Sequence, residues 1–168
     1  ARERATLARP EHRQAARALA ARSIVLLKHT PGVLPLSALH KTVAFVGPLV
    51  KAVKDNHGAW AVTLPDVDYS QFIVTQWSGL RQALPATTKL LYAQGCDVRC
   101  EHRRGFAQAV AAARQADVVV VSVGEDAGMS GEAKSRSRIG LPGLQEDLIR
   151  ALHATGKPVV VLVNAGRP

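Results

Sequence analysis

Runs of consecutive apolar residues alternate along this chain with segments in which apolar residues recur every three or four positions. Continuous runs of this length, bounded by glycine or proline, are typical of strands that are buried on both faces of a parallel sheet. Four such runs predict strands over residues 42–47, 88–95, 117–124 and 157–166.

The segments between these runs have helical spacing. The pattern predicts helices over residues 77–84, 106–115 and 144–152, the last one opened by Pro142 and closed by Gly156. Because strand and helix alternate, we expect right-handed crossovers and a mainly parallel α/β sheet with helices on both faces, that is, a three-layer sandwich.

The N-terminal segment predicts one further helix, from Pro10 to about Leu27, with Pro10 in the first turn. A length of 168 residues favours a single α/β domain over residues 1–168, in which residues 1–30 are a lead-in helix and linker. The chain begins with a charged segment and not with methionine, so it has no signal-peptide pattern and is expected to be a fragment of a longer chain.

Composition changes this picture little. The net charge is +9, but the basic residues are scattered and the aromatic residues (Trp 2, Tyr 2, Phe 3) are spaced singly, so no surface for stacking bases is indicated. No apolar stretch approaches the roughly 20 residues that a membrane span requires. We therefore expect neither nucleic acid nor membrane as a partner.

The two cysteines, Cys96 and Cys100, are close in sequence and lack the second pair or the histidines of a zinc site. No metal is predicted. A short disulfide and two free thiols are both compatible with this spacing.

Candidate chemistry lies in residues 124–140, which follow the third predicted strand. Ligands of open parallel sheets bind at the carboxyl ends of strands, and this glycine-rich segment carries Glu125 and Glu132 there. Its glycine spacing fits no phosphate-binding motif, and its acids would repel phosphate, so no cofactor is predicted. Two interpretations of Glu132 remain: a solvated acid paired with Lys134 or Arg136, or a general acid in a glycosidase-like carboxylate pair.

The long segment 48–71, after the first predicted strand, shows no regular pattern. Loops of this length in compact domains are usually functional or disordered. It contains Trp60 between small residues, where a tryptophan either anchors packing or contacts a ligand.

Several motifs occur together and in order: "ARSIVLLK", "TVAFVGPL", "GAW", "VGEDAGMSGEAKSR", "GLPGLQEDLI" and "GKPVVVLVNAGRP". This combination resembles the C-terminal α/β sandwich domain of glycoside hydrolase family 3, specifically the type found in bacterial periplasmic β-glucosidases. The resemblance covers nearly the whole chain, although the family's sandwich continues beyond "NAGRP", so the chain is expected to be truncated at its C-terminus relative to the family.

The resemblance implies a retaining β-glucosidase that acts on oligosaccharides or aryl glucosides in the periplasm or outside the cell. Its nucleophile, an aspartate, would belong to an N-terminal barrel domain of the same enzyme, and Glu132 would be the general acid/base. Arg136 matches the arginine of the same motif, and Trp60 matches an aromatic residue on the acceptor side, so both are expected to bind substrate. Glu125 is expected to brace the loop.

Arg138 departs from the family, in which an aspartate is usual before "IGLP". The isolated chain is expected to be inactive, because it would hold only one of the two carboxyl groups that retaining catalysis requires. The alternative is a non-catalytic α/β module for carbohydrate binding or packing that shares only the fold.

Overall fold

The computed structural model describes residues 9–58, 60–61 and 68–166. Its contacts divide the chain into two compact units, Ala1–Pro31 and Gly32–Pro168. The first unit contains helix α2, Pro10–Ser23, with Pro10 in its first turn as predicted. The helix was expected to reach about Leu27, and this is wrong: the backbone is extended at Ile24. Two β-branched residues, Ile24 and Val25, begin the non-helical segment, and their restricted χ1 rotamers disfavour continuing the helix.

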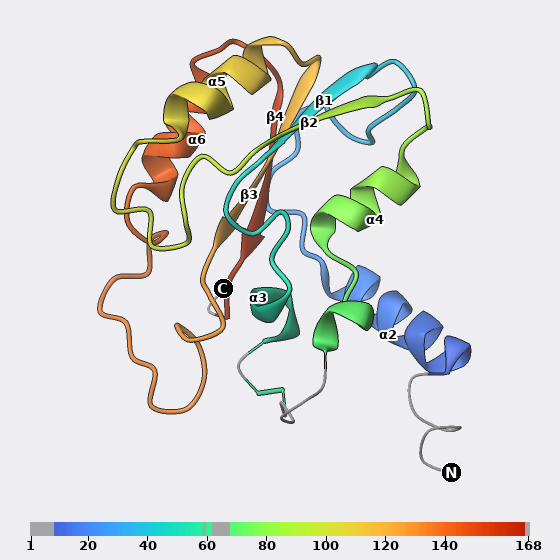
Figure 1. Ribbon diagram of the computed structural model, residues 1–168, viewed down its shortest axis with the longest axis vertical. Helices are drawn as coiled ribbons and strands as arrows, with labels where there is room; N and C mark the ends of the chain where they lie inside the picture. Colours follow the sequence, from blue (N-terminus) through green and yellow to red (C-terminus); the bar gives the residue numbers. More distant parts are fainter. Residues whose placement is uncertain (1–8, 59, 62–67, 167–168) are drawn as a thin grey trace. The chain divides into compact units, whose positions relative to one another are not determined.

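The second unit is built on a four-stranded sheet in the order β2-β1-β3-β4, with all neighbouring strands parallel (Figure 1). Every residue of β3 is buried, which explains its continuous apolar sequence. The four predicted strands are confirmed with slightly shorter bounds: β1 Thr42–Val46, β2 Lys89–Ala93, β3 Val118–Gly124 and β4 Val159–Asn164.

Helices cover both faces of this sheet, which confirms the predicted three-layer α/β sandwich. Helix α4, Gln76–Ala83, packs through Trp77 and Leu80 against one face. Helices α5, Phe106–Arg114, and α6, Gln145–His153, pack against the other. Figure 1 shows α5 and α6 together on one side of the strands and α4 on the opposite side.

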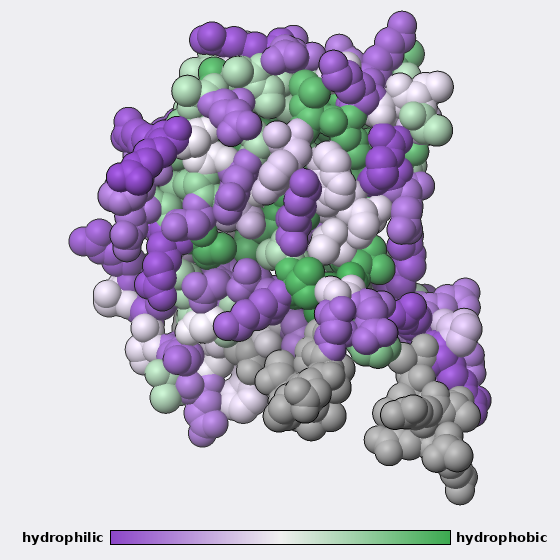
Figure 2. Space-filling model, in the orientation of Figure 1, coloured by the Kyte–Doolittle hydropathy of each residue, from purple (hydrophilic) through white to green (hydrophobic). Residues whose placement is uncertain are grey.

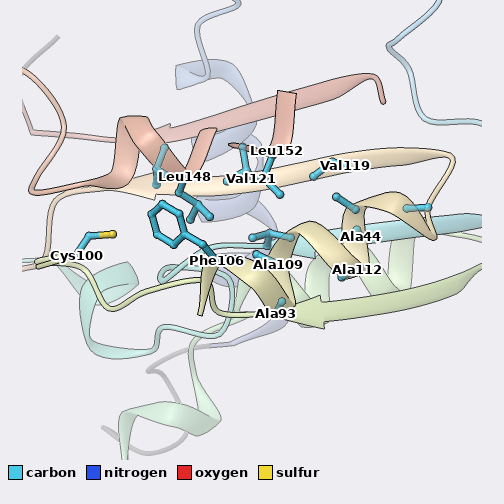
Figure 3. Close-up of a cluster of buried hydrophobic side chains, with 14 residues drawn as sticks. Ala44, Ala93, Cys100, Phe106, Ala109, Ala112, Val119, Val121, Leu148 and Leu152 are labelled. Carbon is cyan, nitrogen blue, oxygen red and sulfur yellow. The ribbon is translucent and has the colours of Figure 1, made fainter. Parts of the chain in front are cut away.

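The core beneath α5 and α6 combines small residues with a few large ones. The face of α5 that meets the sheet is rich in alanine, whereas Phe106, Leu148 and Leu152 lie where α5 and α6 meet (Figure 3). Burying a leucine or phenylalanine side chain contributes about 1.5–3 kcal/mol each. Hydrophilic residues cover much of the visible surface, with apolar patches between them (Figure 2). No helix among the described residues is both long and apolar enough to cross a membrane.

The segment expected to lack regular structure, residues 48–71, contains a short helix α3, Lys54–His57, and a 3₁₀ turn η1, Tyr69–Gln71. Neither is long enough to produce a helical period in the sequence. Residues 59 and 62–67 of this segment lie outside the described residues.

Strand β4 forms one edge of the sheet in the described part of the chain. Its central side chains are apolar but partly exposed, at 40% for Val161, 38% for Leu162 and 51% for Val163. The two central strands, β1 and β3, bury their apolar residues far more completely, and β2 at the other edge is intermediate. This edge is therefore the least protected part of the sheet.

Candidate active site at the carboxyl edge of the sheet

The chain changes winding direction between β1 and β3. From β1 it crosses by way of α4 to β2 on one side, and from β2 it returns by way of α5 past β1 to β3 on the other. In doubly wound sheets, ligands bind outside the carboxyl ends of the strands at this switch point. Two segments leave these ends. One is residues 47–71, with Trp60, and the other is residues 124–143, with Glu132, which we call the Glu132 loop.

A hydrogen bond joins these two segments directly. Asp55, on α3, accepts the backbone N–H of Ala127 through Oδ1 at 3.0 Å. Figure 1 shows α3 and the loop after β3 at the same end of the sheet. The fold thus brings together the two loops on which the sequence predicted site residues.

Gly47, directly after β1, and Gly124, the last residue of β3, are glycines that the close approach of the next strand requires. Gly47 and Gly124 have φ values of +122° and +136°. A Cβ at Gly47 would lie 2.0 Å from the carbonyl oxygen of Ser122, and a Cβ at Gly124 would lie 1.9 Å from that of Asn164. Any larger residue would displace the neighbouring strand, so the sites where the loops leave the sheet are fixed by the backbone.

Glu125 holds the base of the loop. Its side chain is 8% exposed and forms an ion pair with Arg136, whose own side chain is 20% exposed. The second carboxylate oxygen of Glu125 accepts the N–H of Gly166 at 3.3 Å, and Arg136 also donates to the carbonyl of Gly140 at 3.1 Å. These contacts agree with the interpretation of Glu125 as a brace, and they show that Arg136 spans the loop from its start to its end.

Glu132 lies at the opposite, exposed part of the loop. The N–H of Lys134 donates to the carbonyl of Gly131 at 3.2 Å, which closes a turn with Glu132 and Ala133 at its corners. Gly131 and Ala133 both have positive φ, +127° and +56°, and a non-glycine residue in this region is uncommon. Within the described residues no ion pair or hydrogen bond engages the Glu132 carboxylate, so the predicted pairing with Lys134 or Arg136 is not formed there.

The other two acids of the loop, and Asp55 beside it, are engaged. Asp126 accepts the N–H of Gly128 at 2.8 Å, while Asp55 and Glu125 make the contacts given above. Glu132 is thus the acid of this loop that stands exposed and available to a ligand or to another protein surface.

Trp60 is 73% exposed. Within the described residues it does not serve as a buried packing anchor, which was one of its two interpretations. A large exposed aromatic side chain is suited to contact with a ligand or with another domain. Its predicted role in substrate binding stays a prediction, as does that of Arg136, whose guanidinium is directed to Glu125 and Gly140.

A hollow of about 550 Å³ lies beside the loop. One wall is the loop around Glu132, and the other is Arg99, inside the turn that the disulfide closes, with Glu101 directly after it. The charged residues that line it are mostly basic. They are Arg99, Lys134 and Arg136, together with one acid, Glu101.

Cys96 and Cys100 form a disulfide with an S–S distance of 2.16 Å, which decides between the two states that the sequence left open. The carbonyl of Cys100 accepts the N–H of Leu144 at 2.9 Å. The disulfide segment therefore packs against the end of the Glu132 loop. Among the described residues there is no cluster of side chains suited to a metal ion.

Two residues of the site were not predicted from sequence. Asp55 lies in a segment without periodicity, and Gln145, the first residue of α6, comes two positions after a Pro-Gly pair. A polar residue at such positions is common and gives no signal by itself. The strand order brings Asp55 beside the loop after β3, and the fold buries Gln145 where it can form hydrogen bonds with other segments. Neither placement can be read from the sequence.

The fold and the site together define a doubly wound α/β domain that presents a glutamate and a tryptophan from two adjacent loops at its switch point. The chain belongs to the glycosyl hydrolase family 3 C-terminal domain family, whose model matches residues 24–168. This match confirms the resemblance found in the sequence.

The relatives of this chain include proteins named β-glucosidase and proteins named β-xylosidase. It is 40% identical to a periplasmic β-glucosidase of Salmonella typhimurium over 94% of this chain and 22% of that protein. It is 35% identical to a β-xylosidase of Formosa agariphila, again over 94% of this chain and 22% of that protein. The chain thus spans less than a quarter of the length of these relatives.

A solved structure of similar fold is that of a β-glucosidase from Listeria innocua in complex with isofagomine. The match has a TM-score of 0.84 and 31% sequence identity, and it covers 96% of this chain and 21% of that one. The sheet and its helices therefore correspond to one part of a larger enzyme.

Proposed function

We propose that this chain is the C-terminal domain of a retaining β-glucosidase and that Glu132 supplies the general acid/base. The observation that carries this proposal is the contrast between the two glutamates of one loop. Glu125 is paired and nearly buried, whereas Glu132 is exposed at a turn held by the loop's own hydrogen bonds. An acid that must protonate a leaving group has to stand free of such pairing.

Glu132 would act twice in this mechanism. It would first donate a proton to the glycosidic oxygen as the leaving group departs, and the resulting carboxylate would then take a proton from the water that attacks the glycosyl-enzyme intermediate. The nucleophile would be an aspartate of an N-terminal barrel domain in the same protein, since retaining catalysis requires two carboxyl groups roughly 5–5.5 Å apart.

Trp60 and Arg136 are proposed to bind the substrate, an oligosaccharide or an aryl glucoside. Trp60 is exposed and lies on the loop that Asp55 joins to the Glu132 loop, as an acceptor-side platform requires. Arg136 would contribute mainly through its hold on the loop, with its charge at the edge of the hollow beside Glu132.

The proposed sugar is glucose and the proposed location is the periplasm or the outside of the cell. The name of the Salmonella relative supports both, and the Cys96–Cys100 disulfide supports an oxidising compartment. The name of the Formosa relative makes xylose the alternative sugar. Parallel assays of the complete enzyme with 4-nitrophenyl β-glucoside and β-xyloside distinguish them: a higher kcat/KM for the xyloside would reject glucose.

One experiment separates the catalytic role from a purely structural module. The complete enzyme and its Glu132→Gln variant are compared on an aryl β-glucoside and on an alkyl β-glucoside of the same sugar. The proposal expects turnover of the alkyl glucoside to fall about 10²- to 10⁴-fold. Equal activity of the variant and the parent on both substrates would reject it. The isolated chain is expected to hydrolyse neither substrate.

A further inference from the structure

Gln145 is a polar residue with no exposed surface at the start of α6. Its side-chain amide makes three hydrogen bonds. Oε1 accepts the N–H of Gly124 at 2.7 Å, and Nε2 donates to the carbonyl of Gly124 at 2.9 Å and to the carbonyl of Val98. Both N–H groups of the amide and its oxygen are thereby satisfied, as a buried amide requires.

These bonds close the loop that carries Glu132. Gly124 is the last residue of β3, and Gln145 is the first residue of α6, so the amide joins the two ends of the intervening segment. The amide bonds to both the N–H and the C=O of Gly124, as a residue of a neighbouring strand would. The start and the end of the loop are therefore held in one geometry.

The third bond brings in another segment. Val98 lies between Cys96 and Cys100, so the Nε2 bond attaches the disulfide-closed turn to the same point. Next to it, the N–H of Leu144 donates to the carbonyl of Cys100. The end of the loop thus rests on a turn that is itself covalently closed.

We propose that Gln145 is a positioning residue that sets the direction of the Glu132 carboxylate by clamping both ends of its loop. This inference rests on the proposed function, in which Glu132 is the acid/base. Gln145 is buried beneath the loop and acts through it. A displacement of about 1 Å in a reacting group can lower a rate by about 100-fold, so loss of the clamp is expected to impair the steps that Glu132 performs.

The test uses the complete enzyme with Gln145→Met, which keeps the length of the side chain and removes all three hydrogen bonds. Leu148→Ala is the matched control, because Leu148 is also fully buried in α6 but packs in the apolar core beneath it. Both variants are expected to lower Tm. They are compared at a temperature at which circular dichroism shows both to be folded.

The readout is the ratio of kcat/KM for an alkyl β-glucoside to kcat/KM for 2,4-dinitrophenyl β-glucoside. Both values report formation of the glycosyl enzyme, and the dinitrophenyl leaving group needs no proton in that step. Gln145→Met is expected to lower this ratio about 10-fold, by weakening proton transfer alone. Added azide is expected to accelerate its turnover of the dinitrophenyl substrate, because azide attacks the glycosyl enzyme without a base. Leu148→Ala is expected to change neither quantity.

Glu132→Ala, measured in parallel, separates the two proposals. If it lowers the ratio and Gln145→Met does not, the positioning role is overturned and the proposed function stands. If Glu132→Ala itself leaves the ratio unchanged, the proposed function fails and the role of Gln145 fails with it. Should Gln145→Met not fold, Gln145→Asn replaces it, because it keeps an uncharged amide but is one methylene too short to reach both Gly124 and Val98. The same ratio decides.

Discussion

The base and the tip of the Glu132 loop differ in almost every physical respect. At the base, Gly124 and Glu125 are hydrogen-bonded to Gln145, Arg136 and Gly166. At the tip, Glu132 is exposed and lies in a turn whose flanking residues have positive φ. The comparison teaches that a loop can be anchored without any contact to the carboxylate that it presents, because the hydrogen bonds are made where the loop leaves the sheet.

The largest expected effect comes from the tip. In the complete enzyme, Glu132→Ala should lower kcat/KM for alkyl glucosides and disaccharides about 10²- to 10⁴-fold, with a much smaller loss of kcat/KM for aryl glucosides that have acidic phenols. Because the side chain is exposed, the midpoint of thermal unfolding should not change. Steady-state kinetics and calorimetry measure the two effects. If Glu125→Ala gives this leaving-group dependence and Glu132→Ala does not, the two regions have been assigned the wrong way round.

The next effect belongs to the base of the loop. Gly124→Ala should destabilise the chain by about 3 kcal/mol or more, since the new Cβ would meet the backbone of Asn164 at 1.9 Å and φ is +136°. Gly128→Ala is the matched control, because its Cβ would meet only the side chain of Asp126, at 3.2 Å. Urea denaturation compares them. Equal losses would show that the base is no more constrained than the rest of the loop.

Glu125→Ala should have a smaller effect on stability, about 1–3 kcal/mol, because it leaves the largely buried guanidinium of Arg136 without its carboxylate. Glu146→Ala, which removes an exposed ion pair with Arg150, should cost less than about 1 kcal/mol. Denaturant midpoints of the two variants test this order. A loss for Glu146→Ala as large as that for Glu125→Ala would contradict the bracing role.

The smallest effect on stability is expected at the other loop. Trp60→Ala should change the free energy of unfolding by less than about 0.5 kcal/mol, because the side chain is 73% exposed. In the complete enzyme it should raise KM for a disaccharide more than for an aryl glucoside. Unchanged KM values would remove the acceptor-side role, and a large loss of stability would restore the packing interpretation.

The sequence predicted the fold because its signals are local. Continuous runs such as Val118–Gly124 need only burial on both faces, and the glycines and prolines between elements mark where helices begin and end. The helix that was predicted to reach about Leu27 shows where such signals fail, since apolar spacing alone did not reveal that the backbone becomes extended at Ile24.

The candidate site was harder to predict from the sequence than the fold. The motif around Glu132 pointed to the loop after β3 as the place of the candidate acid, and that role stays a prediction. The hydrogen bonds that hold this loop connect residues 11, 21 and 72 positions apart in sequence. No periodicity encodes such contacts. They follow from the strand order, which places the loop after β1 beside the loop after β3.

The exposed edge of β4 has a consequence for handling the chain in solution. An edge strand offers a row of backbone N–H and C=O groups, and here Val161, Leu162 and Val163 add apolar side chains to it. Edges of this kind are templates for pairing with a strand of another molecule. Concentrated preparations of the isolated chain should therefore self-associate in spite of the net charge of +9, and Leu162→Lys should keep them monodisperse.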